Sequence, residues 1–240
     1  MKVFAIIPSG GSGLRMNNPP CLPASQRGEP DRQVPKQYIR INGKEIIAYT
    51  LEVFQKCELI DEIIISARKD YFDLLQIIKK NYSFSKISKI VEGGDERQQS
   101  VFNALKSINA KDNDLIVVHD AVRPLLPLDV LSKAIESAKI SGSAVVAIKA
   151  KDTLIKGMDP VVSYIDRQDV YYAQTPQVFR YKILLDAMNQ AEKENFIGTD
   201  ESMLVHRSGY KVNIVGGSSI NFKITNEEDL LIFEKIVQKS

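Results

Sequence analysis

The chain has 240 residues, and its 32 basic and 30 acidic side chains leave a formal net charge of only +2. This balance excludes the extended basic surface by which a protein binds nucleic acid. With 44% hydrophobic and 26% charged residues, the composition also excludes a disordered chain, a collagen and a coiled coil.

Short β-branched segments alternate along the chain with segments whose apolar residues recur every three or four positions. This alternation is typical of an α/β sheet whose strands are joined by crossover helices. The predicted strands are 3–7, 62–66, 87–91, 115–119, 143–148 and 211–215. The predicted helices are 46–56, 70–80, 97–108, 129–139, 182–193 and 227–238. We therefore expect residues 1–240 to form one α/β domain around a Rossmann-like, mostly parallel sheet.

The first apolar segment, 3–7, ends at Pro8 and is too short for the apolar core of a secretory signal. No part of the sequence approaches the roughly 18 apolar residues of a membrane span. Cys21 and Cys57 are too few for the disulfide framework of a small secreted protein. A cytoplasmic protein that binds neither membrane nor nucleic acid is expected.

Two segments interrupt the alternation of strands and helices. Residues 152–166 hold two short extended runs around Gly157-Met158-Asp159-Pro160, which predicts a β-hairpin. A hairpin that leaves a sheet needs the body or a second subunit to cover it, and we interpret this one as the dimerisation arm of a homodimer. Residues 17–34 contain four of the ten prolines and predict an insertion loop, of a kind that is usually a lid or disordered.

The segment 9–16, SGGSGLRM, follows the first predicted strand. Glycines at this point let backbone N–H groups approach a phosphate at the carboxyl edge of the sheet, although a plain glycine turn is the alternative. Arg15 favours the anion site, because a guanidinium at its rim can bridge two phosphates. The segment is neither a Walker A loop nor a dinucleotide fingerprint, since Met16 stands where the latter needs a small residue. The candidate nucleotide-binding residues of this loop are Ser9, Gly10, Gly11 and Gly13.

A lysine and a second glycine pair are further candidates. Lys36 follows the proline-rich stretch and begins the next ordered segment, opposite the glycine-rich loop. A lone lysine is usually a solvated surface charge, but at this position it could bind an anion. Gly93 and Gly94 stand where a strand ends and a helix begins, and they permit close backbone approach to a flat ligand such as a base. The alternative is that Asp95 is only the N-cap of that helix.

A predicted buried strand ends at His119 and is followed by Asp120 and Arg123. A carboxylate at the carboxyl edge can hold a metal–phosphate group or ribose hydroxyls, whereas an Asp–Arg pair that only closes the strand is the alternative. His119 alternates into the sheet, so we expect a hydrogen-bonded core histidine. With His206 the only other histidine, a histidine metal cage is not expected.

Three later segments, 165–167, 173–177 and 198–201, each read singly as a turn or a helix cap. Lys223 is expected in an inner strand between apolar neighbours, where its charge needs an anionic partner such as a phosphate. Before the last predicted helix, Thr225-Asn226-Glu227-Glu228 predicts a capping box.

In this order, the segments resemble the 2-C-methyl-D-erythritol 4-phosphate cytidylyltransferase family of the non-mevalonate isoprenoid pathway. The matching motifs are Arg15-Met16, Pro35-Lys36-Gln37, 93–97, 119–124, Thr175-Pro176-Gln177, 199–201 and Lys223. The resemblance implies transfer of a cytidylyl group from CTP to the sugar-alcohol phosphate, with Mg²⁺ as cofactor and pyrophosphate as leaving group. The chain departs from the family at Ser9-Gly10, where Ala-Ala is usual, and in the length of 17–34.

The resemblance also implies a role for each matched residue. Those expected to flank the reacting α-phosphate are Arg15, Lys36 and Lys223. Those expected around the cytosine and its triphosphate are Gly10, Gly11, Gly94, Asp95 and Ser100. Asp120 would reach the ribose or, through the triphosphate, the metal. The sugar-phosphate side would be lined by Arg123, Thr175 and Thr199. Family members are homodimers whose arm reaches the neighbouring site, so Thr153 and Arg167 would act across the interface.

The sequence is also compatible with other functions. A ribitol-5-phosphate cytidylyltransferase would share the fold and most of the motifs, and a non-catalytic nucleotide-binding protein would keep the fold without the reaction. A dinucleotide oxidoreductase is disfavoured by Met16 and by the absence of an acid after the second predicted strand. No general base is expected, because a phosphate monoester is mostly dianionic at neutral pH. Catalysis then reduces to positioning and charge neutralisation.

Overall fold

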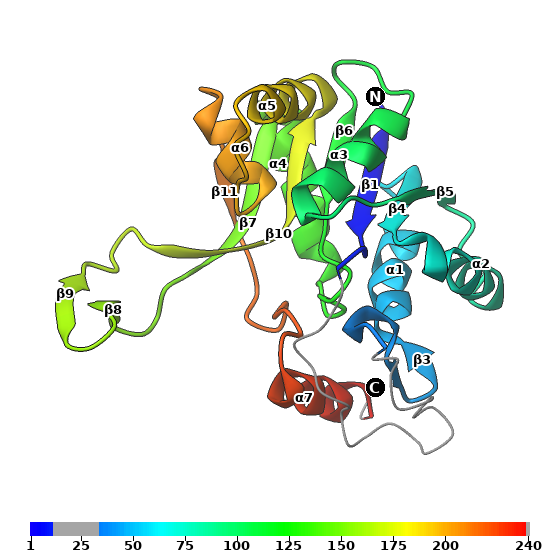
Figure 1. Cartoon of the computed structure of the whole chain (residues 1–240), viewed down its shortest axis with the longest axis horizontal. Helices are drawn as coiled ribbons and strands as arrows, with labels where there is room; N and C mark the ends of the chain where they lie inside the picture. The colour runs from blue at the N-terminus through cyan, green and yellow to red at the C-terminus, as the bar shows by residue number, and fades with distance from the viewer. Residues whose placement is uncertain (12–33, 239–240) are drawn as a thin grey trace.

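The centre of the molecule is a seven-stranded sheet (Figure 1). The structure, a computed structural model, describes residues 1–11 and 34–238. The strands of the sheet are β1 (Val3–Pro8), β4 (Glu62–Ala67), β5 (Ile87–Glu92), β6 (Leu115–Val118), β7 (Ser143–Lys149), β10 (Tyr171–Arg180) and β11 (Asn213–Gly216). They lie in the order β11-β7-β10-β6-β1-β4-β5, and β10 runs antiparallel to both of its neighbours. The predicted mostly parallel α/β sheet is confirmed.

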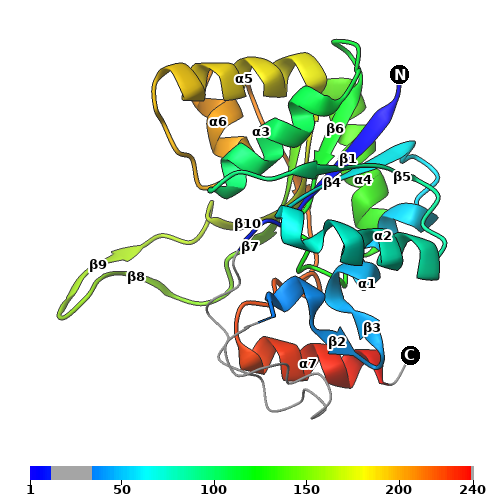
Figure 2. The ribbon, with the colours of Figure 1, turned by 45° about the vertical axis from the view of Figure 1, so that its right-hand side comes forward.

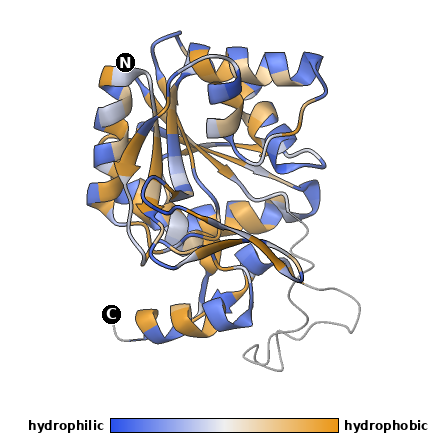
Figure 3. Ribbon diagram, turned by 90° about the vertical axis from the view of Figure 1, so that its left-hand side faces the viewer, coloured by the Kyte–Doolittle hydropathy of each residue, from blue (hydrophilic) through white to orange (hydrophobic). Residues whose placement is uncertain are grey.

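Helices cover both faces of this sheet (Figure 2). The helices on one face are α1 (Ile46–Lys56), α2 (Phe72–Asn81) and α4 (Leu128–Ser141). Those on the other face are α3 (Arg97–Ser107), α5 (Tyr181–Lys193) and α6 (Glu201–Arg207). Along β1, Ala5 and Ile7 face the first layer while Phe4 and Ile6 face the second, because successive side chains of a strand point to opposite faces. Figure 3 shows the resulting apolar sheet between helices that are polar on their outer sides.

A third apolar cluster lies beyond the carboxyl edge of the sheet. Here the C-terminal helix α7 (Glu227–Val237) packs its Phe233 against Ile46 and Ile224, near the short strands β2 (Arg40–Ile41) and β3 (Lys44–Glu45). The capping box of α7 is present one residue later than predicted, since Asn226 is the N-cap and Asp229 is its partner. None of the helices in the described ranges has the length and hydropathy of a membrane span.

A two-stranded antiparallel hairpin stands away from the body of the molecule in Figures 1 and 2. Its strands are β8 (Leu154–Gly157) and β9 (Val161–Ile165), within the predicted segment 152–166. Large apolar side chains on it are exposed, with Val162 at 74% and Tyr164 at 73% of their full accessibility. Surface of this kind usually marks an interaction site.

Residues 173–177 and 222–225 differ from their predictions. The first segment, read as a turn, lies inside the ten-residue strand β10, where a register shift between Ala173 and Gln177 accommodates Pro176. The second has no regular secondary structure, so Lys223 is not in a strand. The short helix α6 was not predicted, although the reading of 198–201 as a helix cap is confirmed by Asp200, whose side chain accepts a hydrogen bond from Met203 N.

The predicted insertion loop 17–34 lies outside the described residues except for Val34. Gly13 and Arg15 also lie outside them. The remaining candidate residues all lie within the described ranges.

Candidate active site

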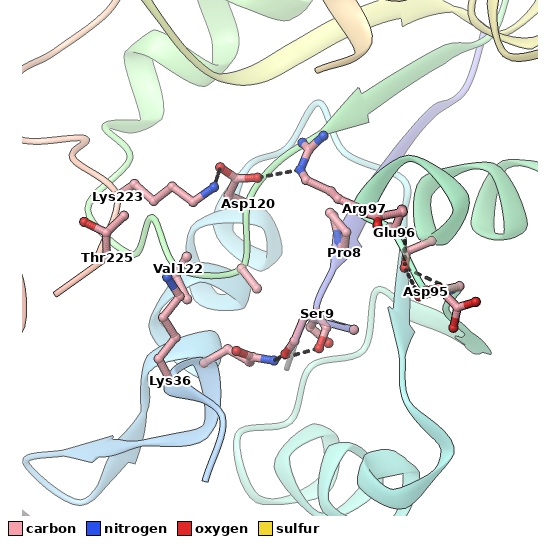
Figure 4. A pocket seen from close by; sticks show the side chains of 16 residues that line it. Pro8, Ser9, Lys36, Asp95, Glu96, Arg97, Asp120, Val122, Lys223 and Thr225 are labelled. Carbon is pink, nitrogen blue, oxygen red and sulfur yellow. Dashed lines mark hydrogen bonds and ion pairs between the residues drawn. The ribbon is translucent and has the colours of Figure 1, made fainter. Parts of the chain in front are cut away.

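A cavity of about 560 Å³ opens where β1, β5 and β6 end (Figure 4). This is the edge of an open α/β sheet at which ligands bind, and the volume is that of an ordinary small-molecule site. The sequence candidates that line it are Ser9, Gly10, Gly11, Lys36, Gly94, Asp95, Ser100, Asp120 and Lys223. The structure thus brings together residues from both ends of the chain.

The first glycine loop is held by the short 3-10 turn Lys36–Tyr38. The side-chain amide of Gln37 donates hydrogen bonds to the carbonyl oxygens of Ser9, at 2.8 Å, and of Gly11, at 3.1 Å. The hydroxyls of Ser9 and Tyr38 lie 3.1 Å apart, and burial raises the pKa of Tyr38 to about 12, which keeps the phenol protonated. Gln37 was not a sequence candidate, and its place beside Lys36 in the Pro-Lys-Gln motif was the only signal for it.

The second glycine loop is held by Ser100 of α3. Gly94 N donates to Ser100 Oγ at 3.0 Å, and a Cβ at Gly94 would overlap Gln99, with its Cγ only 2.1 Å away. The N-cap of α3 is Glu96, with no side-chain capping hydrogen bond, so the reading of Asp95 as the N-cap is wrong. Asp95 is instead exposed and lines the cavity (Figure 4).

Asp120 lies at the centre of a charged cluster. Its Oδ1 accepts from Arg97 Nε at 3.0 Å, while its Oδ2 lies 3.1 Å from Lys223 Nζ and 3.4 Å from Arg123 Nε. Burial alone would raise the pKa of this carboxyl, but the adjacent cations, led by Arg97, hold it well below its usual range. The alternative of an Asp120–Arg123 pair that only closes the strand does not describe the site, because two further cations from distant parts of the chain share the carboxylate.

Arg97 links Asp120 to a second buried carboxylate. Its Nη1 donates to both oxygens of Glu201, at 2.7 and 2.9 Å. Burial raises the pKa of Glu201, and the guanidinium of Arg97 opposes that effect. Arg97 lines the cavity, yet neither residue was a sequence candidate, although both stand in motifs that carried the resemblance.

Lys223 reaches the cavity from the segment before α7. Its neighbour Ile224 is buried in the third apolar cluster, and Ile224 N donates to Val122 O at 3.0 Å. This anchor places Lys223 Nζ at Asp120, so the expectation of an anionic partner is met by a carboxylate of the chain itself. Figure 4 shows Lys36 and Lys223 entering the cavity from separate segments.

Of the sequence candidates within the described residues, five do not line this cavity: Arg123, Thr153, Arg167, Thr175 and Thr199. Thr175 is buried behind it, where its Oγ1 accepts from Asp120 N at 3.1 Å. Arg123 donates to Asn221 O at 2.8 Å. Thr199 is exposed near α6, and Thr153 and Arg167 are exposed at the base of the hairpin.

His119 is the buried, hydrogen-bonded core histidine that its alternation in the strand predicts. It has no exposed surface, its Nε2 lies 3.1 Å from Arg123 O, and its Nδ1 lies 3.0 Å from the Thr175 hydroxyl. Since the carbonyl of Arg123 can only accept, Nε2 carries the proton and Nδ1 accepts from Thr175. Burial lowers the pKa of His119 to about 4.

This shift makes the free energy of unfolding depend on pH. Between the ordinary pKa of 6.5 and the folded value of about 4, the unfolded chain binds a proton at His119 that the folded chain does not. Stability is therefore expected to fall by about 3 kcal/mol as the pH falls through this window. Urea unfolding followed by circular dichroism at several pH values measures the slope. His119→Gln should flatten it, and His206→Gln, at an exposed histidine, should not. An unchanged slope in His119→Gln would show that other groups cause it.

Among the described residues, no group of three or more His, Cys, Asp or Glu side chains is arranged to hold a metal ion. Asp120 nevertheless presents a carboxylate to the cavity. Mg²⁺ is commonly held by one or two carboxylates together with substrate phosphates. Both oxygens of Asp120 are already paired with cations of the chain, so the donor set fits a metal whose ligands come mainly from a triphosphate.

Comparisons with known proteins agree on one family. A family model described as IspD, 2-C-methyl-D-erythritol 4-phosphate cytidylyltransferase, matches residues 3–239. A protein of that name from Geobacter metallireducens is 39% identical over 244 residues, covering 100% of this chain and 99% of the relative. Another from Syntrophus aciditrophicus is 39% identical over 241 residues, covering 99% of this chain and 97% of the relative.

Solved structures give the same result. The 4-diphosphocytidyl-2C-methyl-D-erythritol synthase of Anaerococcus prevotii superposes with a TM-score of 0.81 at 29% identity, covering 99% of this chain and 96% of that one. The 2-C-methyl-D-erythritol 4-phosphate cytidylyltransferase of Francisella tularensis gives 0.77 at 28% identity, covering 98% and 99%. Matched from end to end in sequence and in fold, the chain belongs to the 2-C-methyl-D-erythritol 4-phosphate cytidylyltransferase family.

Proposed function

We propose that this chain transfers the cytidylyl group of CTP to 2-C-methyl-D-erythritol 4-phosphate. The products are 4-diphosphocytidyl-2-C-methyl-D-erythritol and pyrophosphate, in the synthesis of isoprenoid precursors. Family membership supports this reaction. The observation that carries it is the cavity itself, in which two glycine loops face Lys36 and Lys223 across one opening.

The chemistry follows from charge. The phosphate of the acceptor is mostly dianionic at neutral pH and attacks the α-phosphorus of CTP, while pyrophosphate leaves. The main barrier is the approach of two anions, so the chain's work is to align them and to neutralise charge where it develops. In this scheme Lys36, Lys223 and Arg15 flank the α-phosphate. The backbone of Gly10, Gly11 and Gly94 receives the nucleotide.

Oxygens of the triphosphate would supply most of the ligands of Mg²⁺, with Asp120 beside them. When bound, the ion would reduce the negative charge of the phosphates. Asp120 itself is held in place by Thr175 behind it and by Arg97 beside it. The chain therefore presents this carboxylate in a fixed orientation.

The acceptor would lie on the side of Arg123, Thr175 and Thr199. We further propose a homodimer in which the hairpin of one subunit brings Thr153 and Arg167 to the site of its partner. The exposed apolar side chains of β8 and β9 support this proposal, because a two-stranded hairpin is rarely stable without a surface to cover it. We place the reaction in the cytoplasm, because both substrates are multiply charged and do not cross a bilayer unaided.

Pyrophosphate release tests the function directly. Purified protein is incubated with CTP and either 2-C-methyl-D-erythritol 4-phosphate, ribitol 5-phosphate or no acceptor, and the nucleotide product is identified by mass spectrometry. We expect an appreciable rate with the methylerythritol acceptor only. A rate confined to ribitol 5-phosphate would identify the alternative enzyme. Binding of CTP without release under any condition would show a nucleotide-binding protein.

A further inference from the structure

Glu201 is a buried carboxylate whose cationic partner, within the described ranges, is Arg97. It is 1% exposed and is the first residue of α6, where the helix dipole favours a negative charge. Both of its oxygens accept from Arg97 Nη1, at 2.7 and 2.9 Å. One side of the guanidinium is thereby occupied at the wall of the cavity.

The other side of the guanidinium, at Nε, faces Asp120. Arg97 Nε donates to Asp120 Oδ1 at 3.0 Å, and Asp120 Oδ2 lies 3.1 Å from Lys223 Nζ. Figure 4 shows Arg97 and Lys223 on opposite sides of Asp120. A continuous line of alternating charges therefore runs from Glu201, outside the cavity, to Lys223, inside it.

We propose that Glu201 and Arg97 are positioning residues for the cytidylyl transfer, and that Glu201 holds the guanidinium against Asp120 and away from the triphosphate. This inference rests on the proposed function. A guanidinium at the cavity wall would otherwise bind phosphate oxygens in pairs. Such binding would stabilise bound CTP as much as it stabilises the transition state. It would therefore lower the Kd for CTP without raising kcat.

The contact between Arg97 and Asp120 also fixes the positions of Asp120 and Lys223. If Arg97 turned to the phosphates, Asp120 Oδ1 would lose that partner and the carboxylate would be held through Oδ2, by Lys223 and Arg123. The carboxylate could then shift, and Lys223 with it. Misplacement of a reacting group by about 1 Å can cost about 10²-fold in rate.

Glu201→Gln tests this role, because it keeps the shape of the side chain and removes its charge. We expect the Kd for CTP, measured by calorimetry, to fall about threefold to tenfold, since one added phosphate contact is gained. The kcat is expected to fall at least about tenfold, because Asp120 is no longer held by Arg97. The matched control is Glu194→Gln, which removes the same charge from an exposed pair with Arg207 at 2.9 Å and should change neither value.

Arg97→Lys provides a second variant that does not depend on the folding of the first. It keeps the positive charge, but one ammonium cannot reproduce the planar fork that joins two carboxylates. We expect kcat to fall about tenfold or more with the Kd for CTP changed by less than about threefold.

If the Glu201–Arg97 pair only stabilised the fold, the variants would give a different result. They would have a lower melting temperature and a smaller fraction of active protein, but the Kd and kcat per active site would match those of the wild type. That outcome in both variants, or CTP binding weakened in Glu201→Gln, overturns the proposal. Failure of the proposed function is distinguishable, because it would be seen as absent pyrophosphate release by the wild type, whereas CTP affinity remains measurable in every variant.

Discussion

Replacing Lys36 by Ala is expected to lower kcat by about 10²–10³-fold, while the Kd for CTP rises far less. Lys36 stands on the turn that also carries Gln37, whose amide is bonded to the backbone of the first glycine loop. Its charge is therefore held at the cavity rather than on a free surface chain. In the proposed reaction its charge is needed most when negative charge develops at the α-phosphate, so its loss should appear mainly in the transition state.

Steady-state kinetics with both substrates, together with calorimetric titration of CTP, separates the two effects of Lys36→Ala. Lys133→Ala is the matched control, because it removes an exposed lysine that pairs with Asp129 on the outer side of α4. A large rise in Kd with kcat preserved would contradict the proposed role and would make Lys36 a triphosphate anchor only.

Mixing two inactive variants is expected to restore activity if the hairpin completes the partner's site. Arg167→Ala removes a side chain at the base of the hairpin, and Lys36→Ala removes one that lines the cavity of its own subunit. In a mixed dimer, one site would lack both residues and the other would lack neither. Random pairing of equal amounts would therefore return about a quarter of the wild-type sites.

Co-expression with two different affinity tags isolates the mixed dimer and makes the comparison independent of subunit exchange. The matched control combines Lys36→Ala with Lys223→Ala, because both residues line one cavity within one chain. Every site of that mixed dimer lacks a cation, so no activity should return. Equal inactivity of the two mixtures would show that Arg167 does not act across an interface.

The parallel part of the sheet is predictable because its strands are short, apolar and separated by helices of regular period. β10 is not, because its middle contains Pro176, which lacks the N–H of a sheet residue and reads as a turn. Pro176 is accommodated in this central strand by the register shift between Ala173 and Gln177. The same shift brings Thr175 behind Asp120. That arrangement depends on tertiary pairing and leaves no local signal.

Some residues of the site can likewise be identified from the sequence, and others cannot. The glycine loops are local features, so their residue types and their positions after predicted strands identify them, and Lys36 is marked by its place directly after the proline-rich stretch. Arg97 and Glu201 are separated by more than a hundred residues, and their pairing exists only once α3 and α6 share one face of the sheet. Lys223 was expected in a strand because of its apolar neighbours, but those neighbours pack against α7 instead.

The two hydrogen bonds of Gln37 link the first glycine loop to the turn that bears Lys36. Because Gln37 is bonded to the carbonyls of Ser9 and Gly11, a shift of this loop towards a nucleotide that kept both hydrogen bonds would also move the turn that bears Lys36. Binding of a nucleotide at the loop and the position of Lys36 would then be coupled. By reciprocity of linked equilibria, a compound that fixes the turn in its reactive position should also bias the loop towards nucleotide binding.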